Sequence, residues 1–373
     1  MKEWLIIDLL VLLWVVTFTS IIIPQILRVA FRKNLFDVPG PRKIHHLDIP
    51  RLGGIAFYPA IPLSLFILYG FGMHYGTAET QQVLVASVES ISFVFGGAVL
   101  LYLTGIADDI IGVKYKAKFL VQLIASVFVI MGNVTLSNLH GFLGFHQLSP
   151  VSAVILTVVI IVFVINAVNL IDGIDGLASG LSVLACAFYA VVFARADQYV
   201  FSALAIATMG TLFPFFLFNV FGSAVNHRKI FMGDTGTLTI GLLLGVMSVR
   251  VCQLPACAGG ENPGAAAFAP LLIPCLDVVR VYFYRLYRHQ NPFLPDQTHI
   301  HHKMLALGLT QRAAMFIILL CSALLTLANF FLSVCVDINI LFFCDLLLWI
   351  VVNYFMTHRI RMREQRLSKK LFD

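Results

Sequence analysis

Long, uninterrupted apolar runs constrain most strongly what this chain can fold into. Each run is about 20 residues long, the length of a helix that crosses the hydrocarbon core of a bilayer. Hydrophobic residues make up 60% of the 373 residues and charged residues only 12%, whereas about a quarter of a soluble domain is charged. This composition excludes a water-soluble enzyme and a disordered chain, and continuous runs disfavour an outer-membrane barrel. We therefore expect an all-α, polytopic integral membrane protein.

Polar interruptions divide the sequence into about eleven predicted transmembrane helices within one membrane domain, residues 1–373. The predicted spans are 4–23, 53–72, 88–106, 119–132, 151–168, 177–194, 200–221, 236–252, 266–284, 313–334 and 339–356. All but three of the 25 lysines and arginines fall in one set of connections, the exceptions being Lys2, Arg195 and Arg250. Because basic connections remain cytoplasmic, we predict an external N-terminus and a cytoplasmic C-terminus.

The seven cysteines show no CxxC spacing, and most lie inside apolar runs. We therefore expect neither a zinc site nor a disulfide framework. Cys252 and Cys257 share one loop and could form a disulfide if that loop faces an oxidising compartment.

Aspartates gather at the predicted cytoplasmic ends of the spans, where uncompensated carboxylates are costly. Neighbouring Asp108 and Asp109 diverge by about 100° on a helix, so one can face a site while the other orients a lysine or acts as a base. Asn169, Asp172 and Asp175 recur at i, i+3 and i+6 and share a face if the segment is helical. Their oxygen ligands suit Mg²⁺. The alternatives are solvated carboxylates and helix caps.

Three further segments carry polar or basic groups on the same predicted side. Gly233 and Asp234 lie in a glycine-rich turn before a span, and such a helix start suits phosphate; Asp234 could hold a metal or only cap the helix. The loop 37–54 is basic and rich in proline, and Pro295–Lys303 contains three histidines, which suit polyanion contact or proton transfer. Plain topological charge and solvated histidines are the alternatives.

Together these clusters indicate Mg²⁺-assisted phosphoryl transfer between a water-soluble polyphosphate and a lipid. The predicted active site is formed by the cytoplasmic loops 24–52, 107–118, 166–178, 222–236 and 285–312.

At these motifs the chain resembles the polyprenyl-phosphate N-acetylhexosamine-1-phosphate transferases, glycosyltransferase family 4. The resemblance covers most of the chain, and its motifs are Pro39–Gly54, Gly105–Gly112 with Lys114 and Lys118, Asn166–Gly180, Phe231–Gly241 and Thr298–His302. It implies that undecaprenyl phosphate attacks the β-phosphorus of a UDP-N-acetylhexosamine, releasing UMP and starting a lipid-linked cell-surface glycan. It also implies a multi-pass protein of the inner, cytoplasmic membrane that uses Mg²⁺, or Mn²⁺ in its place, and has no nucleic-acid partner.

The resemblance also assigns residues to roles. It implies catalytic Asp108, Asp109, Asp172 and Asp175, substrate-binding Arg51, Lys118, Gly233, His299, His301 and His302, and metal-binding Asn169, Asp172 and Asp234. Some members have a third aspartate where this chain has Gly112, so that carboxylate is dispensable or supplied elsewhere.

Details within the motifs favour one branch of the family. The Pro50–Gly54 segment and the interrupted His-Ile-His-His sequence resemble the branch that uses UDP-N-acetylglucosamine, as in teichoic-acid and O-antigen (lipopolysaccharide) initiation. The nearest alternative is the phospho-MurNAc-pentapeptide transferase of peptidoglycan synthesis, and a cation-coupled transporter is the alternative from another class. The sequence leaves open the identity of the sugar, direct attack against an aspartyl-phosphate intermediate, and whether the chain forms a homodimer.

Overall fold

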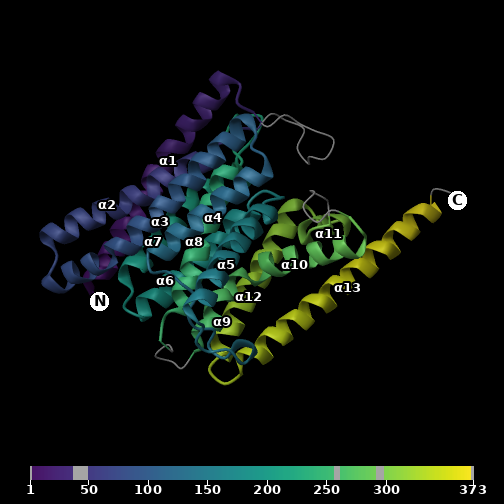
Figure 1. Cartoon of the computed structure of the whole chain (residues 1–373). Helices are drawn as coiled ribbons and strands as arrows, with labels where there is room; N and C mark the ends of the chain where they lie inside the picture. The colour runs from purple at the N-terminus through teal and green to yellow at the C-terminus, as the bar shows by residue number, and fades with distance from the viewer. Residues whose placement is uncertain (1, 37–48, 256–260, 291–297, 371–373) are drawn as a thin grey trace.

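A computed structural model of the chain describes residues 2–36, 49–255, 261–290 and 298–370 (Figure 1). Its long helices are α1 (Lys2–Lys33), α2 (Phe57–Tyr75), α3 (Ala78–Ile111), α4 (Tyr115–Met131), α5 (Pro150–Ile171), α6 (Leu177–Arg195), α7 (Tyr199–Phe221), α8 (Gly233–Cys252), α10 (Leu272–Tyr287), α12 (Gln311–Leu332) and α13 (Ile338–Lys370). Short helices are η1 (Gly53–Ala56), η2 (Phe142–Gly144), α9 (Pro263–Phe268), η3 (Ala269–Leu271) and α11 (Ile300–Ala306). The all-α prediction is confirmed within these residues.

Ten helical segments of the described chain are long and apolar enough to cross a membrane. They correspond to ten of the eleven predicted spans. The remaining one, 119–132, is helix α4, whose 17 residues stand at the lower limit of the roughly 17–25 that a crossing takes. Large apolar side chains such as Leu5, Phe66 and Leu347 are exposed around the bundle, as expected for surfaces that contact lipid. The protein is therefore a polytopic membrane protein.

Proline changes two of the predicted spans in different ways. Helix α1 continues through Pro24 to Lys33, so the first span is longer than predicted. The span predicted at 266–284 is broken at η3, where Pro270 stands, because proline has no N–H to donate and its ring crowds the preceding turn. Helix α10 follows directly after this turn, and the segment Pro263–Tyr287 remains one candidate span.

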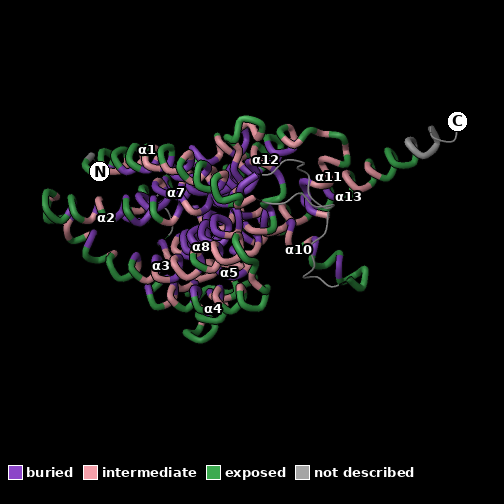
Figure 2. Tube along the Cα trace, turned by 90° about the horizontal axis from the view of Figure 1, so that it is seen from above, coloured by how far each residue is buried: buried purple, intermediate pink, exposed green. Residues whose placement is uncertain are grey.

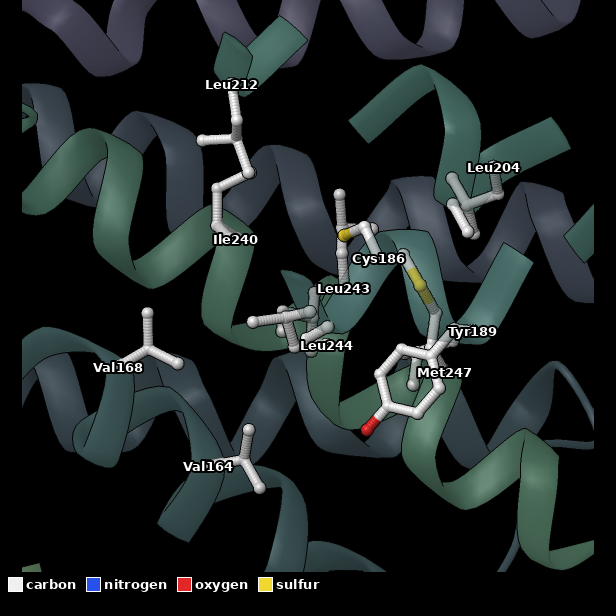
Figure 3. Packing of buried hydrophobic residues seen from close by; sticks show 14 of the residues in the cluster. Val164, Val168, Cys186, Tyr189, Leu204, Leu212, Ile240, Leu243, Leu244 and Met247 are labelled. Atoms are coloured by element: carbon white, nitrogen blue, oxygen red, sulfur yellow. The ribbon is translucent and has the colours of Figure 1, made fainter. Parts of the chain in front are cut away.

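Helix α8 forms the centre of the bundle, where Figure 2 shows an almost continuously buried tube ringed by more exposed helices. Its small residues permit this position, because helices pack closely in membranes where side chains are small. A Cβ atom at Gly241 would lie 2.7 Å from the Cα atom of Ile165 on α5. Around α8 the apolar side chains of α5, α6 and α7 interdigitate (Figure 3), which fixes the direction in which its N-terminus points.

Helix α13 lies apart from the rest of the bundle. It runs diagonally along one side and ends far from the N-terminus (Figure 1). It contacts α9 and η2 near its start and α11 further along. Cys252 is a buried free thiol at the end of α8, whereas Cys257 lies outside the described residues, as do residues 37–48 of the basic loop and 291–297 before the histidines.

Candidate active site

The site forms where the C-terminal end of α3 meets the N-terminal end of α8. Gly105 makes the approach possible, because a Cβ atom there would lie 2.3 Å from the Cα atom of Thr235. Only two residues separate Gly105 from the aspartate pair, so Asp108 and Asp109 lie beside the first turn of α8. The sequence predicted that these two carboxylates diverge, and they do.

Asp108 faces a lysine of the next helix. The Nζ atom of Lys118 lies 3.2 Å from Asp108 Oδ2 and 2.8 Å from Asp234 Oδ2, while Asp108 Oδ1 accepts from the Val113 N–H. The three side chains remain partly exposed. Burial alone would lower the pKa of Lys118, but Asp234 and Asp108 outweigh burial and raise it, so the ammonium stays charged. A solvent-accessible cation between two carboxylates can contact an incoming anion.

Asp109 instead holds the start of α8. Its Oδ1 accepts from the Asp234 N–H at 2.8 Å, and its Oδ2 accepts from the Thr235 N–H at 3.0 Å and the Thr235 hydroxyl at 2.6 Å. These N–H groups belong to the first turn, which has no partner within its own helix. Asp109 is therefore an N-terminal cap supplied by another helix, and its negative charge also suits the positive end of the helix dipole.

This arrangement corrects two expectations about the glycine-rich turn. The N–H groups of Asp234 and Thr235 were predicted to be free for phosphate, but Asp109 already accepts from both. Asp234 does not cap α8 either, since its carboxylate accepts from Lys118 and from the Asn169 amide. Gly233 adopts a φ of +73°, and a Cβ atom there would lie 2.2 Å from the Arg51 carbonyl oxygen and 2.4 Å from Asp109 Oδ2. Gly233 therefore serves close packing, and Asp234 is left to face the site.

The segment 169–176 is not one helical face. Helix α5 ends at Ile171, so Asp172 stands at the helix end and Asp175 in the turn before α6. The prediction that Asn169, Asp172 and Asp175 share a face is therefore wrong. The physical reason lies in the glycines: Gly176 adopts a φ of +78°, and a Cβ atom at Gly173 would lie 2.0 Å from the Nε2 atom of His301.

The three polar residues of this segment consequently have separate environments. Asn169 donates its Nδ2 group to Asp234 at 3.3 Å and to Thr237 at 2.7 Å, so it orients Asp234. Asp175 pairs with Lys229 from the α7–α8 connection. Asp172 has an exposed side chain. Partial loss of hydration raises its pKa above the usual carboxyl range, Arg51 opposes this shift, and Asp175 and Asp234 add to it.

Arg51 comes to the site through backbone pairing. The Phe231 N–H donates to the Pro50 carbonyl at 2.8 Å, and the Gly53 and Gly54 N–H groups donate to the carbonyls of Phe231 and Met232, each at 2.9 Å. The pairing brings the segment around Arg51 against the start of α8. An arginine predicted to bind substrate therefore lies within electrostatic reach of Asp172.

The histidine motif completes the set of neighbours. His299 Nδ1 lies 2.7 Å from Asp277 Oδ2, and the Ile300 N–H donates to Asp277 Oδ1 at 3.1 Å. His301 is buried against Gly173, neither of its ring nitrogens has a hydrogen-bond partner in the described structure, and burial lowers its pKa to about 3. The His302 ring lies 4.3 Å from that of His301 between centroids. Segments from all five predicted loops thus meet at one end of the bundle.

Sequence reasoning missed several residues that hold these segments together. Asn219 is buried in α7, accepts from the Gly176 N–H at 2.6 Å and donates to the Ile230 carbonyl at 2.8 Å, which ties two site loops together. Thr235 was recognised only as part of its motif, and Asp277 only as an aspartate at the cytoplasmic end of a span. A lone asparagine inside an apolar run was the available signal, because such a residue must find partners in a membrane.

The described residues contain no ready-made cluster of three histidine, cysteine or acidic side chains that could hold a metal. Lys118 stands between Asp108 and Asp234, and Asn169 presents its amide nitrogen to the cluster. Mg²⁺, however, is usually held by one or two carboxylates and substrate phosphates rather than by an all-protein cage. Asp234 and the solvent-reaching Asp172 supply that donor set, so the residues fit an ion that binds together with a diphosphate.

The fold and the site define a multi-pass membrane protein with a cationic and acidic site at one end of its helices. Residues 91–252 match the family model described as glycosyl transferase family 4. This stretch is similar to a glycosyl transferase family 4 domain, in agreement with the resemblance drawn from the motifs.

Known proteins show the same similarity over a longer stretch. A protein of Escherichia coli O157:H7 named undecaprenyl-phosphate alpha-N-acetylglucosaminyl 1-phosphate transferase is 28% identical over 313 residues, covering 83% of this chain and 79% of that protein. A Yersinia pestis protein of the same name is 26% identical over 302 residues, covering 80% and 77%. The similarity thus extends beyond the residues 91–252 of the domain match.

Proposed function

We propose that this protein transfers N-acetylglucosamine-1-phosphate from UDP-N-acetylglucosamine to undecaprenyl phosphate, releasing UMP. The single observation that carries the proposal is the Lys118 ammonium held between Asp108 and Asp234 at the membrane boundary. Such a cation is placed to meet a diphosphate at the level where a lipid phosphate lies. The two relatives described above carry names that specify this sugar and this lipid, which favours the N-acetylglucosamine branch.

In this proposal each side chain acts through its position. Lys118 and Arg51 contact the diphosphate. When the Lys118 side chain moves toward the diphosphate, the Asp234 carboxylate becomes free to bind a metal ion. Asp234 and Asp172 would hold Mg²⁺, which neutralises charge on the diphosphate and on departing UMP when it is bound. Asp109 keeps the first turn of α8 in place, so it is a positioning residue for Asp234.

The bond changes balance without a further reactant. An oxygen of undecaprenyl phosphate forms a bond to the β-phosphorus, and the bond from that phosphorus to the bridging oxygen breaks. UMP departs with the bonding electron pair, and the lipid now carries a diphosphate linked to the sugar. Catalysis of this kind depends on positioning and charge neutralisation.

We further propose that the site faces the cytoplasm in the inner membrane. The support is the sequence distribution of basic residues together with the site, since Asp108, Asp172 and Asp234 lie at helix ends on the predicted cytoplasmic side. Cation-coupled transporters place such groups near the middle of the bilayer. The arrangement therefore favours a transferase over a transporter.

A panel of donors tests the proposal. Purified protein is incubated with undecaprenyl phosphate, Mg²⁺ and one UDP-sugar at a time, and UMP release is followed. UDP-N-acetylglucosamine should support turnover, while UDP-glucose and the UDP-MurNAc-pentapeptide should not. Lys118→Met, which removes the ammonium between two carboxylates, should lower turnover at least about a hundredfold. Turnover of the pentapeptide nucleotide alone would assign the protein to the peptidoglycan branch.

A further inference from the structure

The last transmembrane helix has a polar contact with the histidine motif that the proposed chemistry does not use. Lys303 follows the three histidines, which the sequence assigned to polyanion contact or proton transfer, and lies on α11. Its Nζ atom instead donates to Asn353 Oδ1 at 3.0 Å and to Thr357 Oγ1 at 3.1 Å, both on α13. We call Lys303, Asn353 and Thr357 the α11–α13 contact.

A second contact one turn further along joins the same two helices. The Arg363 guanidinium of α13 donates to the Ala306 carbonyl at the end of α11 at 2.8 Å. Gly308, with a φ of +96°, leaves space for that guanidinium, because a Cβ atom there would lie 2.4 Å from Arg363 Nη1. The short helix α11 is therefore held along its length by α13.

The opposite side of α11 is held by α10. Asp277 accepts from the Ile300 N–H and lies 2.7 Å from His299, while Arg280 donates to Asp277 and to the Thr298 carbonyl. Between these two attachments, His301 is pressed against Gly173, the residue after Asp172. The position of His301 at the site thus depends on α10 on one side and α13 on the other.

The position and chemistry of Lys303 suit it to attach α11 to α13. Asn353 is buried and also donates to the Trp349 carbonyl, and the Thr357 hydroxyl donates to the Asn353 carbonyl, so both acceptors are fixed on α13. Burial lowers the pKa of Lys303 to about 8, with Arg280 adding to the shift. A half-buried ammonium without acceptors is unfavourable, so the lysine is committed to α13.

We infer that Lys303 is a positioning residue: through Asn353 and Thr357 it lets the last transmembrane helix α13 set the place of the histidine motif, and with it the affinity for the nucleotide-sugar. This inference rests on the proposed function for its kinetic consequence only. Lys303 itself does not touch the substrate, and the effect passes through α11 to His301.

A double-mutant cycle separates positioning from direct contact. In Asn353→Leu/Thr357→Val both acceptors are removed with little change in shape, and Lys303→Met removes the donor. The KM for UDP-N-acetylglucosamine should rise about tenfold in each, equivalent to about 1.4 kcal/mol, while kcat stays within about twofold. Combining all three changes should cost no more than Lys303→Met alone, because the same contact is lost. Lys303→Arg should restore part of the affinity. Tyr354→Phe, at the exposed position next to Asn353 on α13, is the matched control expected to behave as wild type.

A measurement without substrate keeps the inference independent of the reaction. Hydrogen–deuterium exchange of residues 300–306 should accelerate about tenfold in Asn353→Leu/Thr357→Val and stay unchanged in Tyr354→Phe. Unchanged exchange or an unchanged KM would each overturn the inference. Additive effects of Lys303→Met and Asn353→Leu/Thr357→Val would also overturn it, because Lys303 would then act on the substrate directly. A wild-type protein that releases no UMP would refute the proposed function, and the exchange measurement would still decide the role of α13.

Discussion

Replacing Asp109 by asparagine should destabilise the protein far more than the same change at its neighbour. Asp109 accepts three hydrogen bonds from the first turn of α8, two from backbone N–H groups and one from the Thr235 hydroxyl. An asparagine keeps one acceptor oxygen and turns an NH₂ group toward an N–H donor. A hydrogen bond to a charged group contributes about 1.5–3 kcal/mol, and loss of a helix cap costs about 0.5–2 kcal/mol. Because these effects overlap, we expect a total loss of about 2–4 kcal/mol.

Asp108→Asn is the matched control for this prediction. Asp108 keeps its acceptor for the Val113 N–H and loses only a partly exposed ion pair with Lys118, which is typically worth less than about 1 kcal/mol. The free energy of unfolding of both variants is measured by titrating detergent-solubilised protein with SDS. Asp108→Asn should lower turnover with little loss of stability. An Asp109→Asn variant as stable as wild type would refute the capping role and return Asp109 to the list of catalytic candidates.

Three other perturbations test separate parts of the account. Asp234→Asn should leave the size-exclusion profile unchanged and lower UMP release at least about a hundredfold, with partial recovery as Mg²⁺ is raised; activity near wild type with unchanged metal dependence would remove Asp234 from the metal site. The pKa of His301 is about 6.5 in the unfolded chain, and burial lowers it to about 3 in the folded protein. Below pH 6.5 the unfolded chain therefore binds a proton that the folded protein does not bind, and the free energy of unfolding decreases as the pH falls. At pH 5 the decrease amounts to about 2 kcal/mol. In His301→Gln the free energy of unfolding should change less between pH 7.5 and 5 than in wild type, and an equal pH dependence of the two proteins would contradict this prediction. A single cysteine replacing Lys116 in a cysteine-free background should resist an impermeant thiol reagent in intact cells while one replacing His146 reacts; the reverse labelling would place the site outside.

The sequence predicted the membrane fold well because the constraint that decides it is local. A run of about 20 apolar residues must be helical in lipid to satisfy its backbone groups, so nearly every span was located from composition alone. For 119–132 the predicted start was too late, since helix α4 begins at Tyr115, because an apolar run does not show where the helix begins. The sequence did not show the break at η3 either. Pro24 lies within the continuous helix α1, whereas the helix is interrupted at Pro270, and the two sites look alike in the sequence.

Inside the site, the sequence identified the residues better than their partners. The motifs around Asp108, Asp234 and His301 do converge, as the shared predicted side required. What spacing could not show is which carboxylate meets which donor, because this depends on the approach of α3 to α8 at Gly105. Spacing also failed for Asp172 and Asp175, because helix α5 ends at Ile171, before either of them. The partners of Lys303 on α13 could not be predicted either, since these contacts join residues about 50 positions apart along the chain.

The most direct test of the central claim follows the β-phosphorus of the donor. UDP-N-acetylglucosamine labelled with ³²P at the β-position is incubated with purified protein, undecaprenyl phosphate and Mg²⁺, and the organic and aqueous phases are separated. If the protein transfers sugar-1-phosphate, the label moves into the lipid fraction in step with UMP release, and Lys118→Met abolishes both. Label that stays in the aqueous phase as UDP while the sugar moves to the lipid, or label that stays in intact donor, would contradict the account.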